Sequence, residues 1–335
     1  MVRRRLVVLA GALGWRAVAA ESSSHATPQA PLRFGVLPIG GAVESRDKWA
    51  PLLNDMSRAL RRPVAALSVT SYESLEQAIQ RNEVDLALLS AKMALDAVSR
   101  QRMNVLAQVK RHSGEADHRA VLLVRKTGPL DNLEALLARP EQWRLARGDS
   151  RSVSGFILPQ VQLFLPHRIE METRFRGEVI GTHQVTALAV ANGDADVATN
   201  NTTDFERFRQ QFPVEADRLQ VIWRSAPTPP AQIVVRQGVP VAVQKKAQVF
   251  LVRYGQGTGP RADSEREALK SLRAAFGYVA ASNEALLPAA HLEYQLARQS
   301  ALNARWVNEA AREARLQRVE SQYAEQVAAL RNSAR

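Results

Sequence analysis

The feature that most constrains the fold is a regular alternation of short apolar runs with amphipathic segments from residue 32 onward. Residues 32–38 and 84–89 have the composition of buried strands, and residues 47–60 carry apolar side chains at helical spacing. A second series of the same kind begins near residue 130. Strands that alternate with helices indicate an α/β protein with parallel sheets.

The chain is long enough for two lobes, since 335 residues exceed what one hydrophobic core usually serves. We predict that residues 32–124 and 227–295 form the first lobe and residues 125–226 the second. Crossovers near 124 and 226 would leave a cleft between the lobes. Open α/β sheets bind ligands there, beyond the carboxyl ends of their strands.

The C-terminal region is predicted to be helical almost throughout residues 287–330, with an apolar stripe among Arg, Glu and Gln. We expect a long C-terminal helix over residues 296–335. It would either pack on the body or form a homodimer with a second copy.

The N-terminus has the three parts of a secretory signal peptide. Arg3 to Arg5 are cationic, residues 6–15 are apolar, and Ala17 and Ala19 have the spacing that a signal peptidase reads. We predict a signal peptide over residues 1–19, a flexible lead-in over residues 20–31, and a periplasmic mature protein. No later segment contains 18 consecutive apolar residues.

Composition excludes several function classes. The chain has no Cys and only 6 His, and none of these lies in a metal-binding pattern. Nucleotide-binding glycine motifs and a serine nucleophile elbow are also absent, so we expect neither a metal, a cofactor nor enzyme activity. The net charge of +12 is scattered, without an aromatic-interleaved basic patch, so no nucleic acid partner is expected.

The most informative candidate site is the segment 149–155, which follows a predicted strand and opens a predicted helix. The hydroxyls of Ser152 and Ser154 and the backbone N–H groups of Val153 and Gly155 would lie at the start of that helix. Such a cluster of donors, with the positive end of a helix, suits a phosphate-like oxyanion. Ordinary serine capping is the alternative interpretation.

Two further polar positions follow predicted strands. His183 begins another predicted helix, where a ring nitrogen could donate to an anion or make a structural hydrogen bond. Asn201 lies where a ligand would bind, although an Asx turn that caps the helix from Thr203 onward is equally compatible with the sequence.

These segments together resemble the phosphate, phosphite and phosphonate-binding proteins of ABC importers. The resemblance rests mainly on Ser-Val-Ser-Gly-Phe at 152–156, Ala-Leu-Ala-Val-Ala-Asn at 187–192 and Asp-Val-Ala-Thr-Asn-Asn-Thr at 196–202. It implies a two-lobed type-2 periplasmic binding protein fold that closes on its ligand. It also implies a small phosphorus oxyanion as ligand, with an ABC permease and ATPase as partners.

The resemblance also implies roles for single residues. The family's S-T-S loop falls on Ser152, Val153 and Ser154, and its histidine on His183. A tyrosine near the pocket mouth falls on Tyr72.

This chain departs from the family at three implied positions. A second pocket tyrosine is replaced by Leu89, and the carboxylates that hold an ammonium group are replaced by Thr203 and Ala231. A buried ammonium without a carboxylate partner is unfavourable, so we expect weak binding of 2-aminoethylphosphonate.

Two other functions remain open at this point. One is an orphan ligand-sensing binding protein that reports to a membrane sensor. The other is a dimerising interaction protein with a vestigial pocket.

Overall fold

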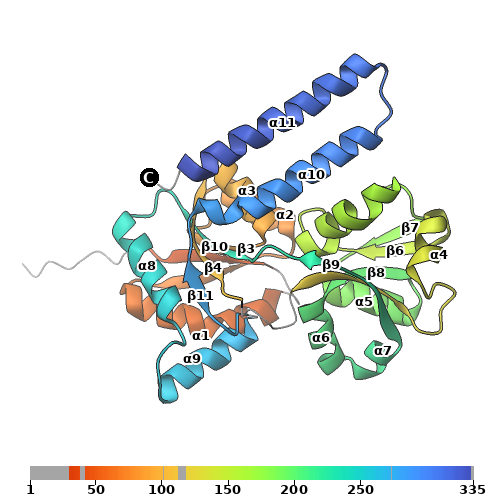
Figure 1. Ribbon diagram of the computed structural model, residues 1–335. Helices are drawn as coiled ribbons and strands as arrows, with labels where there is room; N and C mark the ends of the chain where they lie inside the picture. Colours follow the sequence, from red (N-terminus) through yellow and green to blue (C-terminus); the bar gives the residue numbers. More distant parts are fainter. Residues whose placement is uncertain (1–29, 38–41, 101, 112–117, 273, 333–335) are drawn as a thin grey trace, which may run out of the picture.

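The computed structural model describes residues 30–37, 42–100, 102–111, 118–272 and 274–332 (Figure 1). The predicted signal peptide and nearly all of the predicted lead-in lie outside these residues. Two α/β lobes and a C-terminal helical hairpin make up the described chain.

The first lobe is built on a sheet with the strand order β11-β4-β10-β3-β1-β2. Its strands are β1 (Leu32–Val36), β2 (Val64–Ser68), β3 (Leu86–Leu89), β4 (Met103–Val109), β10 (Gln232–Arg236) and β11 (Tyr278–Ala280). Its helices are α1 (Ala42–Leu60), α2 (Tyr72–Gln80), α3 (Ala91–Ser99), α8 (Val241–Arg253) and α9 (Pro260–Ser271), followed by the short turn η5 (Asn283–Leu286).

The second lobe is built on a sheet with the strand order β7-β6-β8-β5-β9. Its strands are β5 (Arg119–Arg125), β6 (Arg144–Arg147), β7 (Gly177–Ile180), β8 (Val197–Asn201) and β9 (Leu219–Pro227). Its helices are α4 (Leu133–Ala138), η1 (Pro140–Gln142), η2 (Val153–Ile157), η3 (Gln160–Phe164), η4 (Leu165–His167), α5 (His183–Asn192), α6 (Thr202–Gln211) and α7 (Pro213–Asp217).

Both sheets are mixed, which differs from the parallel sheets expected from the alternation. Strand β10 pairs antiparallel with β3 and β4, and β5 pairs antiparallel with β8 and β9. Strands β10 and β5 are also the strands at which the chain enters each sheet from the other lobe. Because β5 belongs to the second sheet, the first crossover lies before residue 119, not near the predicted 124.

The two lobes contain the same contact between an Arg and an Asp. In the first lobe, Arg33 donates from its backbone N and its Nε to Asp85 Oδ2, at 2.9 and 3.2 Å. In the second, Arg144 donates from the same atoms to Asp196 Oδ2, at 2.8 and 3.1 Å. In each lobe the Arg lies on the middle one of three parallel strands, β1 or β6, and the Asp directly precedes one of its two neighbours, β3 or β8. Both lobes therefore contain the same unit of three parallel strands with helices between them.

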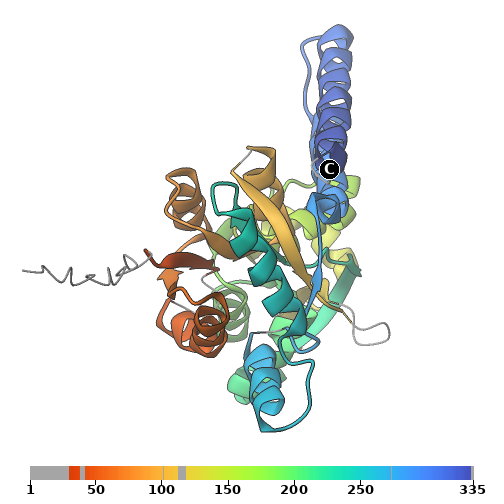
Figure 2. The same cartoon turned by 90° about the vertical axis from the view of Figure 1, so that its left-hand side faces the viewer.

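The C-terminal region forms a hairpin and not the single long helix that the sequence predicts. Helix α10 (Leu287–Asn303) ends before Ala304, which has an extended backbone, and α11 (Glu309–Asn332) returns along it (Figure 2). Asn308 caps α11 by accepting from the Ala311 amide at 2.8 Å, and Trp306 Nε1 donates to the Ala301 carbonyl at 2.7 Å. Part of the apolar stripe, which the sequence left free to pack on the body or on a second copy, is thus covered within the chain.

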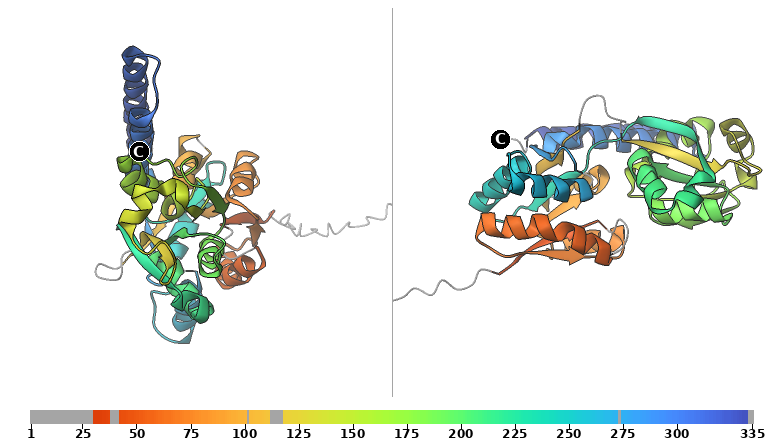
Figure 3. Two further views of the ribbon diagram at one scale, coloured as in Figure 1. Left: turned by 90° about the vertical axis from the view of Figure 1, so that its right-hand side faces the viewer. Right: turned by 90° about the horizontal axis from the view of Figure 1, so that it is seen from below.

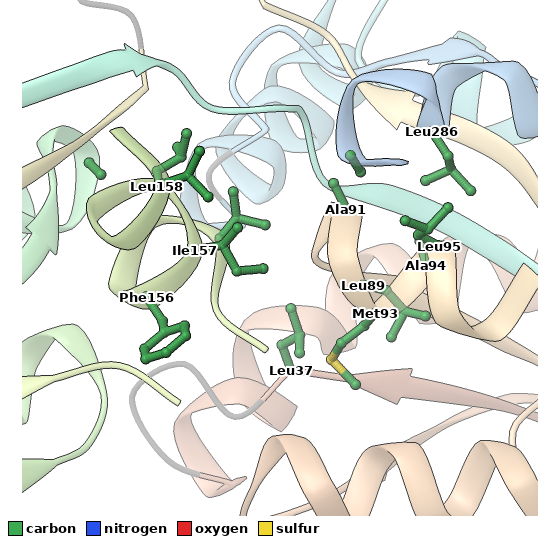
Figure 4. Close-up of a cluster of buried hydrophobic side chains, with 14 of the residues drawn as sticks. Leu37, Leu89, Ala91, Met93, Ala94, Leu95, Phe156, Ile157, Leu158 and Leu286 are labelled. Carbon is green, nitrogen blue, oxygen red and sulfur yellow. The ribbon is translucent and has the colours of Figure 1, made fainter. Parts of the chain in front are cut away.

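Helix α10 also lies against both lobes, contacting α3 of the first and η2, η3 and η4 of the second (Figure 3). One buried apolar cluster continues across the boundary between the lobes. Within it, Leu37 and Ala91 of the first lobe face Ile157 and Leu158 of the second (Figure 4). Among the described residues, no helix combines the length and apolarity needed to cross a bilayer.

Candidate functional site

The loop after β6 is shaped by a proline one turn into the following helix. Pro159 has no amide hydrogen, so the Gly155 carbonyl lacks its usual helical donor. This carbonyl instead accepts from the Gly148 amide at 3.2 Å and from Thr199 Oγ1 at 2.7 Å. The start of the helix is thereby tied to β6 and β8, and its hydrogen bonds there take the wider π spacing, as from Ile157 N to Ser152 O at 3.1 Å.

Gly155 has a different role from the one predicted. It does not line the cleft, and its amide donates to Ser152 Oγ at 3.0 Å. A Cβ at this position would lie 2.8 Å from the Cα of Gly148 and 2.8 Å from Ser152 Oγ. Gly155 therefore permits the close approach of two backbone segments. This approach shapes the serine loop, residues 149–155, although Gly155 itself does not contact the cleft.

The helix start offers donors to the cleft, as the sequence indicates. Gly155 N and Phe156 N donate within the loop, to Ser152 Oγ and to the Ser152 carbonyl. In the part of the chain that the structure describes, the amides of Val153 and Ser154 have no protein acceptor. Both residues line the cleft, so two backbone donors lie at the positive end of the helix.

Ser154 lies at the centre of the polar cluster. Its hydroxyl oxygen is 3.0 Å from His183 Nε2 and accepts from Asn201 Nδ2 at 3.4 Å. Helix starts position both neighbours, because Thr182 caps α5 directly before His183 and Asn201 caps α6. The carbonyl of His183 accepts from Asn200 Nδ2 at 2.8 Å, which ties α5 to the end of β8.

Asn201 therefore satisfies both interpretations of the sequence, as a helix cap and as a cleft residue. Its Oδ1 accepts from the Asp204 amide at 2.8 Å, while its Nδ2 donates to Asp204 Oδ2 at 2.7 Å. Asp204 Oδ2 also lies 3.9 Å from His183 Nε2. Thr203 contacts His118, whose Nδ1 is 3.0 Å from the threonine hydroxyl oxygen.

The first lobe contributes the opposite wall of the cleft. Tyr72 is the first residue of α2, after the capping Ser71, and Ser90 caps α3. Tyr72, Ser90 and Leu37 follow successive parallel strands of the first sheet, and all three line the cleft. The cleft is therefore lined by strand ends and helix starts from both lobes.

The cleft has a volume of about 790 Å³ and contains all but one of the predicted site residues. The predicted residues that line it are Ser152, Val153, Ser154, His183, Tyr72, Asn201 and Thr203. The polar cleft residues that the sequence did not reveal include Ser90, Lys110, Arg111, His118, Asp204 and Thr228. Among the described residues, no group of three or more His, Asp and Glu could hold a metal ion.

Two α/β lobes joined by two crossovers and enclosing a polar cleft define a binding protein of the two-lobed periplasmic type. Comparison with known proteins agrees with this class. A family model described as ABC transporter, phosphonate, periplasmic substrate-binding protein matches residues 34–286. The chain is 33% identical over 254 residues to the phosphonates-binding periplasmic protein of Escherichia coli K12, covering 76% of this chain and 75% of that protein.

Solved structures show the same architecture. A binding protein component of an ABC phosphonate transporter from Pseudomonas aeruginosa is 27% identical, with a TM-score of 0.82 over 91% of this chain and 99% of the other. A protein from Prochlorococcus marinus in complex with methylphosphonate is 18% identical, with a TM-score of 0.67 over 79% and 98% of the two chains. The chain belongs to the family of periplasmic phosphonate-binding proteins of ABC transporters.

Proposed function

We propose that this protein captures a small phosphorus oxyanion, a phosphonate, phosphite or phosphate, and delivers it to an ABC permease and ATPase. One observation carries the proposal. The Ser154 hydroxyl, the His183 ring and two backbone amides without a protein acceptor meet on one wall of the cleft between the lobes.

Physical chemistry favours an anion at this wall. Amides at a helix start carry partial positive charge and are already oriented, so a bound oxyanion exchanges water for fixed donors. Ser152, Ser154 and Asn201 are all buried, which lowers the competition from solvent. Tyr72 and Ser90 approach from the other lobe, so that closure completes the binding shell.

The other residues of the cleft limit which chemical group the ligand can carry besides its oxyanion. Thr203 and Ala231 line the cleft and carry no charge. Among the described residues, three carboxylates also line it, and each accepts a hydrogen bond from a neighbouring side chain: Asp149 from Arg151, Asp204 from Asn201 and Glu206 from Arg209. Because Thr203 and Ala231 stand where the resemblance implies ammonium-binding carboxylates, we infer that a ligand without an ammonium group is favoured, such as phosphite, phosphate or methylphosphonate.

Calorimetry on residues 20–335 tests the proposal, with phosphate, phosphite, methylphosphonate, sulfate and acetate as ligands. We expect at least one of the three phosphorus compounds to bind more tightly than sulfate and acetate. Equal or weaker binding of all three would refute a phosphorus oxyanion as ligand.

The periplasmic location has its own test. We propose that residues 1–19 direct export and are then removed. N-terminal sequencing of the protein recovered from the periplasm should begin near residue 20, and recovery of the intact N-terminus in the cytoplasm would contradict export.

A further inference from the structure

The serine loop of the second lobe is held by the first lobe through Arg151, the residue before Ser152. Arg151 Nε donates to Glu76 Oε2 at 2.8 Å, and Glu76 lies on α2 of the first lobe. The Ser90 hydroxyl, at the start of α3, donates to the Arg151 carbonyl at 3.4 Å. Both the side chain and the backbone of Arg151 are thus bonded across the boundary between the lobes.

Glu76 is itself held in place by two cations. Arg100, from the end of α3, donates to Glu76 Oε1 while Arg151 donates to Oε2, so the carboxylate bridges one guanidinium from each lobe. Burial disfavours the charged form of Glu76, but its bonds to Arg100 and Arg151 outweigh this effect and lower its pKa. The pair is half-buried, with 29% of the Arg151 side chain and 20% of the Glu76 side chain exposed.

Neither side chain touches the ligand site directly, because neither Glu76 nor Arg151 lines the cleft. Arg151 also donates from its backbone N to Asp149 Oδ1 at 2.8 Å, and Asp149 does line the cleft. A tie at Arg151 therefore fixes the loop that presents Ser152 and Ser154. Separation of the lobes must break the bonds to Glu76 and Ser90 while the bond to Asp149 stays within the loop.

We propose that Glu76 and Arg151 form a closure latch: positioning residues that stabilise the closed lobes and slow ligand release without contacting the ligand. The contact joins the lobes in the arrangement that the structure shows. If opening of the lobes breaks it, the contact shifts the lobe equilibrium toward the arrangement in which it is made. As a statement about ligand release, the inference rests on the proposed function. As a statement about lobe closure, it stands independently.

The absence of cysteine makes lobe closure measurable in the full mature chain. Val214 on α7 and Val249 on α8 are exposed, at 63% and 50%, and lie on different lobes. Val214→Cys and Val249→Cys therefore introduce two unique sites for a fluorescent donor and acceptor. Energy transfer between them reports the distance between lobes, with and without methylphosphonate.

The test variants are Glu76→Gln and Arg151→Gln, with Glu73→Gln as the matched control. Glu73 lies on the same helix, is exposed, and bonds to Gln77 within α2. We expect Glu76→Gln and Arg151→Gln each to lower energy transfer in the ligand-free protein. Each should also speed methylphosphonate release by about fivefold, the scale of a half-buried ion pair. The double variant should resemble the single ones, because both remove the same contact.

Unchanged energy transfer and unchanged release in both latch variants, or an equal change in Glu73→Gln, would overturn the proposal. Arg151→Gln provides an independent result if Glu76→Gln does not fold. If the unsubstituted protein binds none of the phosphorus compounds, the proposed function fails, and energy transfer in the ligand-free protein still decides whether the latch exists.

Discussion

The hydroxyl oxygen of Ser154 lies 3.0 Å from Nε2 of His183, although 29 positions separate the two residues along the chain. Each side chain lies at a helix start, and each helix follows a strand of the second sheet. The contact therefore joins two loops that meet at one edge of the sheet. It places the hydroxyl and the ring where both can face an anion in the cleft.

Replacing Ser154 by Ala should strongly weaken ligand binding. A hydrogen bond to a charged group contributes about 1.5–3 kcal/mol, which corresponds to roughly a 10- to 100-fold loss of affinity. Calorimetry with methylphosphonate or phosphate measures this loss. Ser150→Ala is the control, since Ser150 is exposed and does not line the cleft. Equal affinities of the two variants would remove Ser154 from the site.

Replacing Gly155 by Ala should damage the site without adding or removing a cleft side chain. The new methyl group would meet the backbone of Gly148 at 2.8 Å, so the two segments must separate. Forced overpacking of this kind costs about 1–3 kcal/mol of unfolding free energy, measurable by urea denaturation. Ligand affinity should fall as well. Gly177→Ala is a matched control, because nothing lies within 4 Å of its added Cβ. A Gly155→Ala protein as stable as this control would contradict the packing role.

Methylphosphonate should bind more tightly than 2-aminoethylphosphonate, by at least about tenfold, because an unpaired ammonium loses several kcal/mol on burial. Thr203→Glu should narrow this difference by supplying a carboxylate, and Thr203→Gln, which has the same size without charge, should not. Calorimetry on the three proteins with both ligands measures the effect. Sub-micromolar binding of the aminated ligand to the unsubstituted protein would show that another group neutralises the ammonium.

Asp196 should stabilise the second lobe in a pH-dependent manner. Burial of Asp196 opposes ionisation, but its hydrogen bonds from Arg144 outweigh burial and lower the pKa below the ordinary 3.8. A lowered folded-state pKa means that the stabilisation is complete above the ordinary value and is lost as pH falls through the folded-state value. Asp196→Asn should therefore cost about 2 kcal/mol of unfolding free energy at pH 7 and progressively less in acid.

Urea denaturation at pH 7 and pH 3 measures this dependence. Asp194→Asn is the control, since Asp194 is exposed and only two residues away. A constant gap in unfolding free energy between Asp196→Asn and the unsubstituted protein at both pH values would contradict the pKa argument.

The fold class was predictable, and seven of the eight predicted site residues line the cleft, because the signals that mark them are local. Apolar runs mark the strands, and polar residues at the strand end or in the loop after it mark the cleft, as at Asn201 and Ser152. The position of β5 was not predictable, because an apolar run does not reveal which sheet it joins. The role of Gly155 depends on Gly148, and that approach exists only in the folded chain.

The C-terminal hairpin illustrates a second reason for error. Ala304 and Arg305 are good helix formers, so the break between α10 and α11 carries little intrinsic signal. It is stabilised by the Trp306 contact with Ala301 and by the cap at Asn308. Neither contact was predicted from the sequence. Ser90 and Glu76 were missed because their partner, Arg151, is distant in sequence.

The Arg-Asp contact that both lobes contain has a consequence for how substitutions in one lobe affect the other. Arg33 with Asp85 and Arg144 with Asp196 mark two half-sites of common design, and Tyr72 and His183 occupy matching places in them. Because each half has its own Arg-Asp pair, a substitution at Tyr72 in the first half leaves the Arg144–Asp196 pair of the second half in place. A substitution in one half-site can thus change the side chains that this half presents to the cleft while the Arg-Asp pair of the other half stays in place.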